Sequence, residues 1–453
     1  MFRLISQLIH WLFWAGTLFA TEPPLNAAAA IGVELEKVRD SVYPQFQQDD
    51  TFLTRLAVRT DLLEVGGRLA RIPFLPYPGS LFNQFTPDGS SMGPGAGEKY
   101  DNGTTTPVYF NQAVQVTKEA EWETDSKEKS VVDVFKDSFK LNLRQFRSNL
   151  EGLVASSDGS GTLSTVSSAS TAGQLTVANA NNFQSQNTYQ VWSALGGTFR
   201  GTITVLTVDS VNNILYLTAA VPGGTTSGDL LLVGGSSGTA NTSLNGIPAI
   251  NFSSNTGSWF GVPRASYPGI LTTPYYNGSS GPLTPQIVQL LESYMQRATG
   301  VDTEDLDDII AHANVDQVSS WELLGMVSTS AGGFSSGSGQ TAFTMQEGQK
   351  GGDERMDYMK KKRIKTLAGR ELITNIHALA ARLDLICMKY WFRVESKPCA
   401  LFDVDGITVF PLYGSDGGVA TAQAFYFVCG MNVATSRARS GAYSDTLSKP
   451  TGF

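Results

Sequence analysis

The residues that come closest to a catalytic signature are two aspartates near the C-terminal end of the chain. Residues 400–407 read Ala-Leu-Phe-Asp-Val-Asp-Gly-Ile, an apolar stretch that ends in a D-x-D-G pattern. In a phosphatase built on such a pattern, the first carboxylate (Asp403) attacks the substrate and the second (Asp405) is the general acid and base. That chemistry belongs near the start of a Rossmann-like domain, whereas this chain ends at residue 453, and Ile407 stands where the pattern has threonine. We therefore interpret the segment as two strands joined by an Asp-Gly turn, and keep a hydrolase using Asp403 as an alternative.

Other residues of catalytic type lack the context that their chemistry needs. Residues 234–238 and 333–337 match G-x-S-x-G, but both lie in Gly/Ser-rich segments rather than between a strand and a helix. The three histidines, His10, His312 and His377, have no partner at the spacing of metal ligands. The sequence therefore predicts a protein that is not an enzyme, with no catalytic residue, cofactor, metal or small-molecule substrate.

The cysteines are few and irregularly spaced. Cys387, Cys399 and Cys429 are the only three, and none belongs to a C-x-x-C pair. An odd count without paired spacing argues against a disulfide framework and against a zinc site. We expect buried free thiols in a protein made in a reducing compartment.

Composition favours a β-rich chain that does not grip nucleic acid. The chain has 453 residues, 46 of them glycine, and only 16% of its residues are charged. Its net charge of −8 excludes a globally basic DNA-binding protein, because neutralising phosphates requires a surplus of Lys and Arg. The apolar run at residues 4–20 is typical of an export or membrane signal, and its alternative is an N-terminal arm that docks on a neighbouring copy.

The elements that must position any functional residue begin with an extended arm and one long helix. Residues 62–74 and 108–122 read as strands, and they flank a polar stretch, 76–107, too long for an ordinary loop. Because an isolated hairpin is marginal in water, we expect this arm to lie on another surface. Residues 127–154 carry apolar side chains at helical spacing and form a rod of roughly 40 Å.

The rest of the chain divides into a β segment and a mixed segment. Residues 201–208 and 214–220 predict a hairpin around Asn212-Asn213, inside a charge-poor β domain at 157–250. Caps and apolar spacing predict further helices at 285–299, from Asp302 onward and at 356–390. The last predicted strands are residues 400–410 and 424–429.

This order of elements resembles the major capsid proteins of tailed bacteriophages with the Hong Kong 97 fold. Residues 255–264 (Asn-Thr-Gly-Ser-Trp-Phe-Gly-Val-Pro-Arg) are similar to that family's return from an insertion into the body, and residues 382–393 to its late helix-to-strand segment. The resemblance implies an α+β fold with an N-terminal arm, an extended E-loop hairpin, a long spine helix, peripheral and axial domains, and an inserted β-barrel or sandwich. The implied domains are: 1–55, N-terminal arm; 56–125, E-loop and flanking strands; 126–156, spine helix of the peripheral domain; 157–250, inserted β domain; and 251–453, axial domain with the remaining peripheral strands.

The resemblance also implies a function and partners. The chain would be a structural protein that self-assembles into hexamers and pentamers of an icosahedral head around double-stranded DNA, without sequence-specific binding. It would be assembled in the host cytoplasm with a separate scaffolding protein, a portal and a decoration protein, and would reside in the virion. The candidate contacts between subunits are Arg68, Arg71, Lys99, Trp122, Asp305, Asp308, Lys361, Lys362 and Arg363.

Two alternatives stay open beside this interpretation. The basic run at 360–363 opens a predicted helix and is either a solvated face, a partner for the acids at 302–308 of another subunit, or a surface toward DNA. The signal-like start and four N-x-[ST] sequons favour an exported, adhesin-like β protein as the alternative function.

Overall fold

A computed structural model describes residues 52–63, 69–79, 95, 97–117, 134–169, 173–236, 238–239, 242–299, 308–319, 366–367, 370–413 and 419–448. These residues belong to two compact units. Among them, the first unit holds 110–117, 134–146 and 399–429 and the second holds the remainder. Within the described part of the chain, no helix has the length and apolar character needed to cross a lipid bilayer.

The first unit is organised around an aromatic cluster between one helix and one long strand. Helix α4 (Val134–Ser156) begins in this unit, as do the strand segments β19 (Val409–Tyr413) and most of β4 (Val108–Thr117) and β20 (Val419–Thr435). The ring of Phe139 on α4 lies 5.2 Å from that of Phe427 and 6.1 Å from that of Phe425 on β20. Helix α4 confirms the predicted long helix from residue 134 onward, and residues 127–133 lie outside the described residues.

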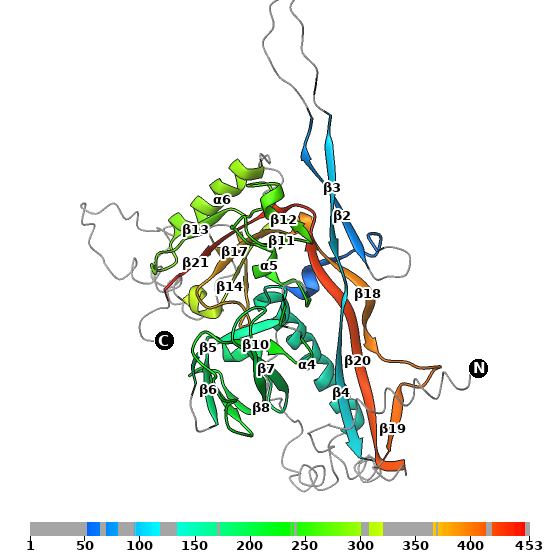
Figure 1. The fold of residues 1–453 in the computed structure, drawn as a ribbon. Helices are drawn as coiled ribbons and strands as arrows, with labels where there is room; N and C mark the ends of the chain where they lie inside the picture. Colours follow the sequence, from blue (N-terminus) through cyan, green and yellow to red (C-terminus); the bar gives the residue numbers. More distant parts are fainter. Residues whose placement is uncertain are drawn as a thin grey trace, which may run out of the picture. The chain divides into compact units, whose positions relative to one another are not determined.

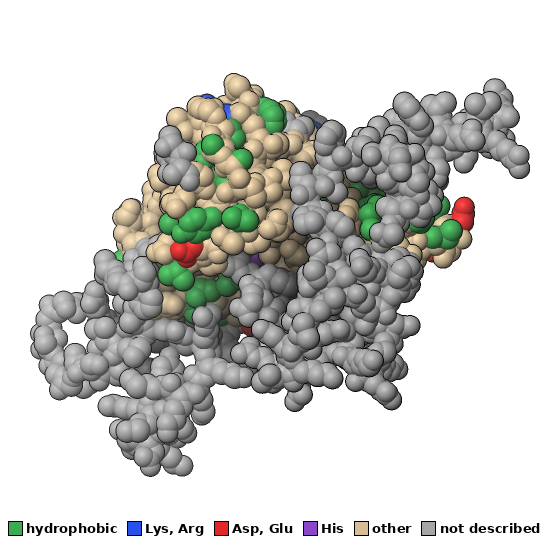
Figure 2. All heavy atoms as spheres, turned by 90° about the horizontal axis from the view of Figure 1, so that it is seen from below, with side chains coloured by type: hydrophobic (Ala, Val, Ile, Leu, Met, Phe, Trp, Pro, Cys, Tyr) green, Lys and Arg blue, Asp and Glu red, His purple; other side chains and the backbone are tan. Residues whose placement is uncertain are grey.

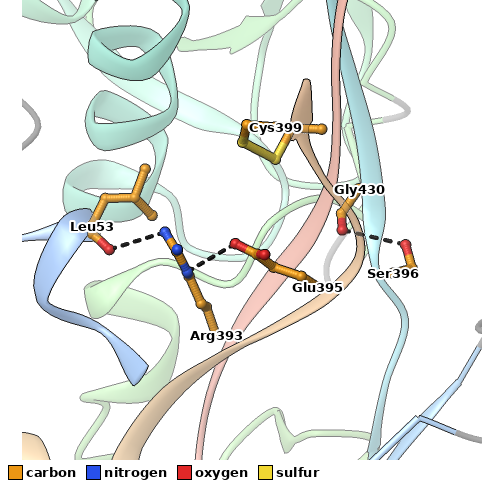
Figure 3. Close-up of a disulfide and its surroundings, with 7 residues drawn as sticks. Leu53, Arg393, Glu395, Ser396, Cys399 and Gly430 are labelled. Carbon is orange, nitrogen blue, oxygen red and sulfur yellow. Dashed lines mark hydrogen bonds and ion pairs between the residues drawn. A yellow bond between two sulfur atoms is a disulfide. The ribbon is translucent and has the colours of Figure 1, made fainter. Parts of the chain in front are cut away.

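A disulfide in the first unit overturns the expectation of three free thiols. Cys399 on β18 (Trp391–Leu401) is bonded to Cys429 on β20, with their Cα atoms 4.2 Å apart (Figure 3). The two residues are 30 positions apart, and their pairing follows from β18 and β20 being neighbours in one sheet. Spacing along the sequence carries no information about such a neighbour relation, which is why the prediction was wrong. Cys387 is a buried thiol outside this bridge, as predicted.

The second unit contains a six-stranded mixed sheet covered by helix α6 (Pro285–Thr299). In sheet order its strands are β13 (Tyr275–Asn277), β21 (Gly441–Asp445), β17 (Leu383–Cys387), β14 (Ile309–Ala313), β16 (Arg370–Thr374) and β15 (Thr366–Leu367). Val288, Leu291 and Met295 on α6 are buried against this sheet, so the predicted helix at 285–299 is confirmed.

The expected helix at 356–390 is wrong where the structure describes it. Residues 370–374 and 383–387 are the strands β16 and β17, and residues 356–365 lie outside the described residues. All five residues of β17 are buried because it lies between two neighbouring strands. A short, fully buried apolar run of this kind cannot be told from a helix segment by its periodicity. The helix expected from Asp302 also falls outside the described residues, and β14 follows at residue 309.

A closed six-stranded β-barrel lies within the range 157–250, for which a β domain was expected. Its strands, in barrel order, are β10 (Leu230–Val233), β5 (Thr162–Ala169), β6 (Gln174–Val177), β9 (Ile214–Leu217), β8 (Phe199–Asp209) and β7 (Thr188–Trp192). Leu175, Val191 and Val205 are fully buried inside it. The hairpin of β8 and β9 turns through Asn213, whose φ of 55° confirms the predicted Asn-Asn turn.

Residues 52–58, which precede the arm, are attached to the C-terminal half of α4 by one buried carboxylate. Glu151 is fully buried and accepts hydrogen bonds from the backbone N–H groups of Phe52 (3.2 Å) and Leu53 (2.8 Å). The carbonyl oxygen of Leu53 in turn accepts from Arg393, which pairs with Glu395 at 2.8 Å (Figure 3). Strand β1 (Ala57–Val58) then pairs in parallel with β18. These contacts hold residues 52–58 in place ahead of the arm.

The arm itself has a different strand pairing from the one expected. Strand β2 (Ala70–Tyr77) pairs with β3 (Lys99–Thr105), whereas β4 pairs with β20. Residues 76–107 were predicted to be a polar connection, and the prediction is wrong for β3 because its sequence, Lys-Tyr-Asp-Asn-Gly-Thr-Thr, has little apolar periodicity. The hairpin therefore has its tip between residues 77 and 99, and residues 80–94 lie outside the described residues.

Candidate assembly interface

The β2–β3 pair is an extended two-stranded ribbon (Figure 1). Its register pairs Ala70 with Thr105 and Pro73 with Asn102, and a bulge follows before Tyr77 pairs with Lys99. Because side chains alternate between the two faces of a strand, each face of the ribbon carries a separate set of residues. An isolated two-stranded ribbon is marginally stable, so at least one face must be covered.

One face of the ribbon docks on two aromatic residues from a short hairpin. Strands β11 (Ser258–Trp259) and β12 (Val262–Pro263) form this hairpin. The ring of Phe74 stands edge-on to Trp259 with centroids 5.1 Å apart, and Ile72 is 1% exposed. The backbone N–H of Thr104 donates to the carbonyl of Phe260 at 2.7 Å. Trp259 and Phe260 thus bury the inner face of the ribbon.

Arg264, which follows this docking hairpin, ties down the surrounding chain. Its guanidinium is 1% exposed and donates to the carbonyl oxygens of Ala249 (3.1 Å), Phe252 (3.2 Å) and Leu271. Burial lowers its pKa from 12.5 to about 10, so it stays charged at neutral pH. Backbone carbonyls thus stabilise this buried charge in place of a carboxylate and link residues 249–252 and 271 to the docking hairpin.

Tyr267 joins the two strands of the ribbon near the bulge. Its hydroxyl donates to the carboxylate of Asp101 at 2.8 Å, and its ring lies 5.8 Å from the ring of Tyr77. The ammonium of Lys99 lies 4.8 Å from the centroid of the same ring. The Tyr267 hydroxyl raises the pKa of Lys99, with a smaller contribution from Asp101, so Lys99 is held charged above this platform.

The opposite face of the ribbon exposes apolar side chains to solvent. Leu75 is 46% exposed and Tyr100 is 69% exposed. Arg71, Pro73 and Asn102 are exposed on the same face. Aromatic and aliphatic groups gathered on one strand face are typical of a surface that contacts another molecule. We take this face, from Arg71 to Leu75 on β2 and from Tyr100 to Thr104 on β3, as the candidate interface, and call it the outer ribbon face.

The structure describes three of the nine predicted contact residues. Arg71 lies on the outer ribbon face, Lys99 lies at the start of β3 against Tyr267, and Asp308 is exposed directly before β14. The structure thus places Arg71 and Lys99 on the same ribbon and Asp308 on a separate element. The other six lie outside the described residues: Arg68, Trp122, Asp305, Lys361, Lys362 and Arg363.

Sequence reasoning missed the side chains that form the interface. Leu75 and Tyr100 were not singled out, and neither was the docking partner Tyr267. The period-two alternation of a strand is a signal in the sequence that points to Leu75, because it places Leu75 on the same face as Arg71 and Pro73. No comparable signal exists for Tyr100, because β3 is polar on both faces.

The segments with catalytic residue types have structural roles where they are described. Asp403 accepts a hydrogen bond from the backbone N–H of Gly406 at 2.7 Å in a tight turn closed by a bridge between Val404 and Ile407. This geometry confirms the Asp-Gly turn. The hydroxyl of Ser236, in the first G-x-S-x-G match, donates to the carbonyl of Ser160. The second match, 333–337, lies outside the described residues.

The two described histidines are buried and neutral. Burial lowers the pKa of both His312 and His377 from 6.5 to about 4. His377 lies between the Ser148 hydroxyl (3.1 Å) and the Asn182 side-chain carbonyl (3.0 Å). Among the described residues, no group of three or more His, Cys, Asp or Glu side chains is placed to hold a metal ion.

Comparison with known proteins points to one class of structure. The sequence matches no protein-family model and no curated protein. In three dimensions the chain is similar to a chain of the cyanophage A-1(L) capsid asymmetric unit, with a TM-score of 0.54 and 9% identity over 91% of this chain and 97% of that one. A chain of the bacteriophage PhiM1 mature capsid covers 91% of this chain and 90% of its own, at 10% identity and a TM-score of 0.42. The likeness to the cyanophage A-1(L) capsid chain shows that the two chains share a fold.

Proposed function

We propose that this chain is the major capsid protein of a tailed bacteriophage, whose copies form the hexamers and pentamers of an icosahedral head. The observation that carries the proposal is the outer ribbon face, which exposes Leu75 and Tyr100 beside polar side chains, on a fold shared with the cyanophage A-1(L) capsid chain. A single subunit leaves this surface in water, whereas a shell provides a neighbouring copy to cover it. The protein would then be a component of the virion.

The finer assignment is the Hong Kong 97 fold. Its support is the order of elements along the chain, in which the β2–β3 ribbon, α4, the barrel and the six-stranded sheet follow one another. On this assignment residues 56–125 hold the E-loop, residues 126–156 the spine helix and residues 157–250 the inserted domain. Residues 1–55 form the N-terminal arm, and residues 251–453 hold the axial domain with the remaining peripheral strands.

The partners follow from the same proposal. Arg71 on the outer ribbon face would contact a neighbouring copy directly. The net charge of −8 suits a shell that encloses DNA without binding its sequence, since no surplus of basic side chains is available to neutralise phosphates. Assembly in the host cytoplasm would involve a separate scaffolding protein, a portal and a decoration protein. The basic run at 360–363 would pair with the acids at 302–308 of another subunit.

Charging the outer ribbon face tests the proposal. In the double variant Leu75→Asp/Tyr100→Asp, both sites are exposed in the subunit, so its unfolding free energy should change by no more than about 0.5 kcal/mol per site. Assembly should fail, because burying a carboxylate without a partner in an interface costs more than the roughly 2–7 kcal/mol of a neutral polar group. The number of assembled particles is counted by electron microscopy of the purified protein mixed with its scaffolding protein, for the variant and for the parent.

A matched control places the same charge elsewhere. Val211→Asp introduces a carboxylate at an apolar barrel residue that is 89% exposed, and should leave particle formation unchanged. If the parent protein stays monomeric under assembly conditions, the proposed function is wrong. Normal shells from the double variant would show that the outer ribbon face is not an assembly contact.

A further inference from the structure

The barrel has a surface almost without charge. Residues 162–233 contain three charged side chains, Arg200, Asp209 and Asp229, in a chain that is 16% charged overall. Arg200 pairs with Asp229 at 2.6 Å, and the Asp229 side chain is 3% exposed. Soluble domains usually carry charges at about a quarter to a third of their surface positions. Figure 2 shows the described surface from one side, with hydrophobic groups and uncharged atoms and few acidic or basic side chains.

One end of this barrel presents an apolar tip. The connection between β7 and β8 reads Trp-Ser-Ala-Leu-Gly-Gly-Thr-Phe from residue 192 to residue 199. Leu195 is 44% exposed and Phe199 is 46% exposed. The ring of Trp192 lies 5.4 Å from that of Phe199. Trp192, Leu195 and Phe199 form what we call the barrel tip, and such aromatic and aliphatic anchors are enriched at the centres of protein interfaces.

The backbone holds the barrel tip in one conformation. Ser193 and Thr198 face each other, with the Ser193 N–H donating to the Thr198 carbonyl (3.0 Å) and the Thr198 N–H to the Ser193 hydroxyl (2.8 Å). The N–H of Gly196 donates to the carbonyl of Gly238 at 2.8 Å, which ties the turn to a second segment. A surface that is already ordered loses little conformational entropy on binding.

We propose that the barrel tip is a self-association surface that contacts the barrel of a second copy of this chain in the assembled shell. The inference rests on the proposed function. Where a two-fold axis relates two identical subunits, the same patch of each copy meets the other, and a charge at the centre of that patch lies close to its own copy and is repelled by it. The barrel tip (Trp192, Leu195 and Phe199) carries no charge, so two copies of it can meet without that repulsion and still bury apolar area.

The charge distribution favours a second copy over an unrelated partner. Partners of different sequence use complementary charges to steer their encounter and fix their register. The barrel tip offers no such charge, and Arg200, the charged residue that follows it in the sequence, is paired with Asp229. The remaining charge, Asp209, is at the opposite end of β8 in the turn to β9. Each contact is small, but the many copies in a shell reinforce one another through multivalency.

Site-directed photo-cross-linking tests the inference. Leu195→Cys is labelled with benzophenone maleimide, which reacts with this exposed thiol because Cys387 is buried and Cys399 and Cys429 are bonded to each other. Irradiated particles should give a band at twice the 48.6 kDa chain mass. Peptide mapping should place the second attachment within residues 162–233 of another copy. Unassembled subunits should give no such band.

Val211→Cys is the matched control, because Val211 is an exposed apolar residue in the turn between β8 and β9, which follows the other end of β8. Its label should give several-fold less dimer. A second variant, Phe199→Asp, should still form particles, but these should dissociate at lower denaturant concentration than Val211→Asp particles.

Three outcomes overturn the inference, and they separate it from the proposed function. Intact particles in which Leu195→Cys gives no more dimer than Val211→Cys overturn the inference alone. Attachment to a different protein, or to a segment outside the barrel, does the same. Failure of the parent chain to form any particle overturns the proposed function and this inference with it.

Discussion

The ribbon and the barrel both present apolar side chains to solvent, but they are stabilised in opposite ways. The ribbon has two strands, and its inner face is covered by Trp259, Phe260 and Tyr267 from elsewhere in the chain. The barrel has six strands that close on one another, so no strand edge remains open. Its core consists of its own fully buried residues, such as Leu175 and Val191.

The difference predicts how each region responds to mutation and to assembly. The ribbon depends on a few long-range aromatic contacts, so losing one should release it while the rest of the second unit stays folded. The barrel carries its own core, so its exposed tip can be altered without unfolding the domain. We therefore expect the ribbon to gain order from a neighbouring copy, and the barrel tip to bind one without changing shape.

Trp259→Ala is expected to have the largest effect. Trp259 is 2% exposed, and replacing a buried tryptophan with alanine costs about 3–5 kcal/mol. The lost free energy should mainly weaken the docking of the ribbon on the rest of the second unit. Trypsin should therefore cleave after Lys99 much faster than in the parent protein. Limited proteolysis followed by mass spectrometry measures the rate at this site.

The control for Trp259→Ala is a buried aromatic residue of the barrel. Phe183 is also 2% exposed and stacks edge-on against Tyr189. Phe183→Ala should lower the unfolding free energy by a similar amount without exposing Lys99 to trypsin. Equal cleavage rates at Lys99 in the two variants would show that the ribbon is not separately docked.

Acid should weaken the attachment of the barrel. His377 joins Ser148 on α4 to Asn182 beside the barrel, and burial lowers the pKa of His377 from 6.5 to about 4. Because the pKa is depressed in the folded state, the contribution of this neutral histidine to the free energy of unfolding is fully present above pH 6.5. That contribution is lost as the pH falls toward 4. The loss should be on the order of 3 kcal/mol for each such histidine, and His312 is a second one.

Urea unfolding at pH 7.5, 5.5 and 4 measures this loss, with His377→Gln as the comparison. Removing His377 should reduce the pH dependence by about half, because His312 still titrates. The sequence between Ala70 and Thr105 contains no histidine, so the docking of the ribbon should not contribute. If the free energy of unfolding of His377→Gln depends on pH as strongly as that of the parent protein, protonation of His377 is not the cause of the loss in acid.

The elements that the sequence predicted correctly are those with local signals. Helix α6 has Pro285 at its first position and an apolar face at helical spacing, and both signals are visible in a short window. The β8–β9 hairpin has Asn213 at a position of positive φ, which asparagine tolerates. Arg71 was placed on the arm because the alternating pattern of residues 62–74 is local, and Lys99 because it lies in the polar stretch between the two predicted strands.

The errors share a different physical cause, because they concern contacts between distant residues. Strand β3 has little apolar periodicity and is held by backbone pairing with β2 and by the Thr104–Phe260 hydrogen bond. The Cys399–Cys429 bridge depends on which strands are neighbours in a sheet. Strand β17 is buried on both faces, so its apolar run carries no period that separates strand from helix.

Two glycines beside the barrel tip give the smallest and most specific test of the comparison. Both Gly238 (φ +67°) and Gly235 (φ +81°) have a backbone conformation that L-residues disfavour, so alanine at either costs about 1 kcal/mol. A Cβ at Gly238 would also lie 2.6 Å from the Trp192 ring, whereas nothing lies within 4 Å of a Cβ at Gly235. Gly238→Ala should therefore cost about 1–3 kcal/mol more than Gly235→Ala, because Trp192 must move.

Thermal unfolding of the two variants measures the difference in their unfolding free energies. Cross-linking in assembled particles then shows whether displacing Trp192 weakens the contact between copies. If the barrel tip is a preorganised contact surface, displacing Trp192 should lower the Leu195→Cys cross-linking yield in the Gly238→Ala background but not in the Gly235→Ala background. The ribbon should dock equally in both, with unchanged cleavage at Lys99. Equal unfolding free energies for the two variants would mean that the tip relaxes freely, and the contrast between an ordered barrel tip and a dependent ribbon would then fail.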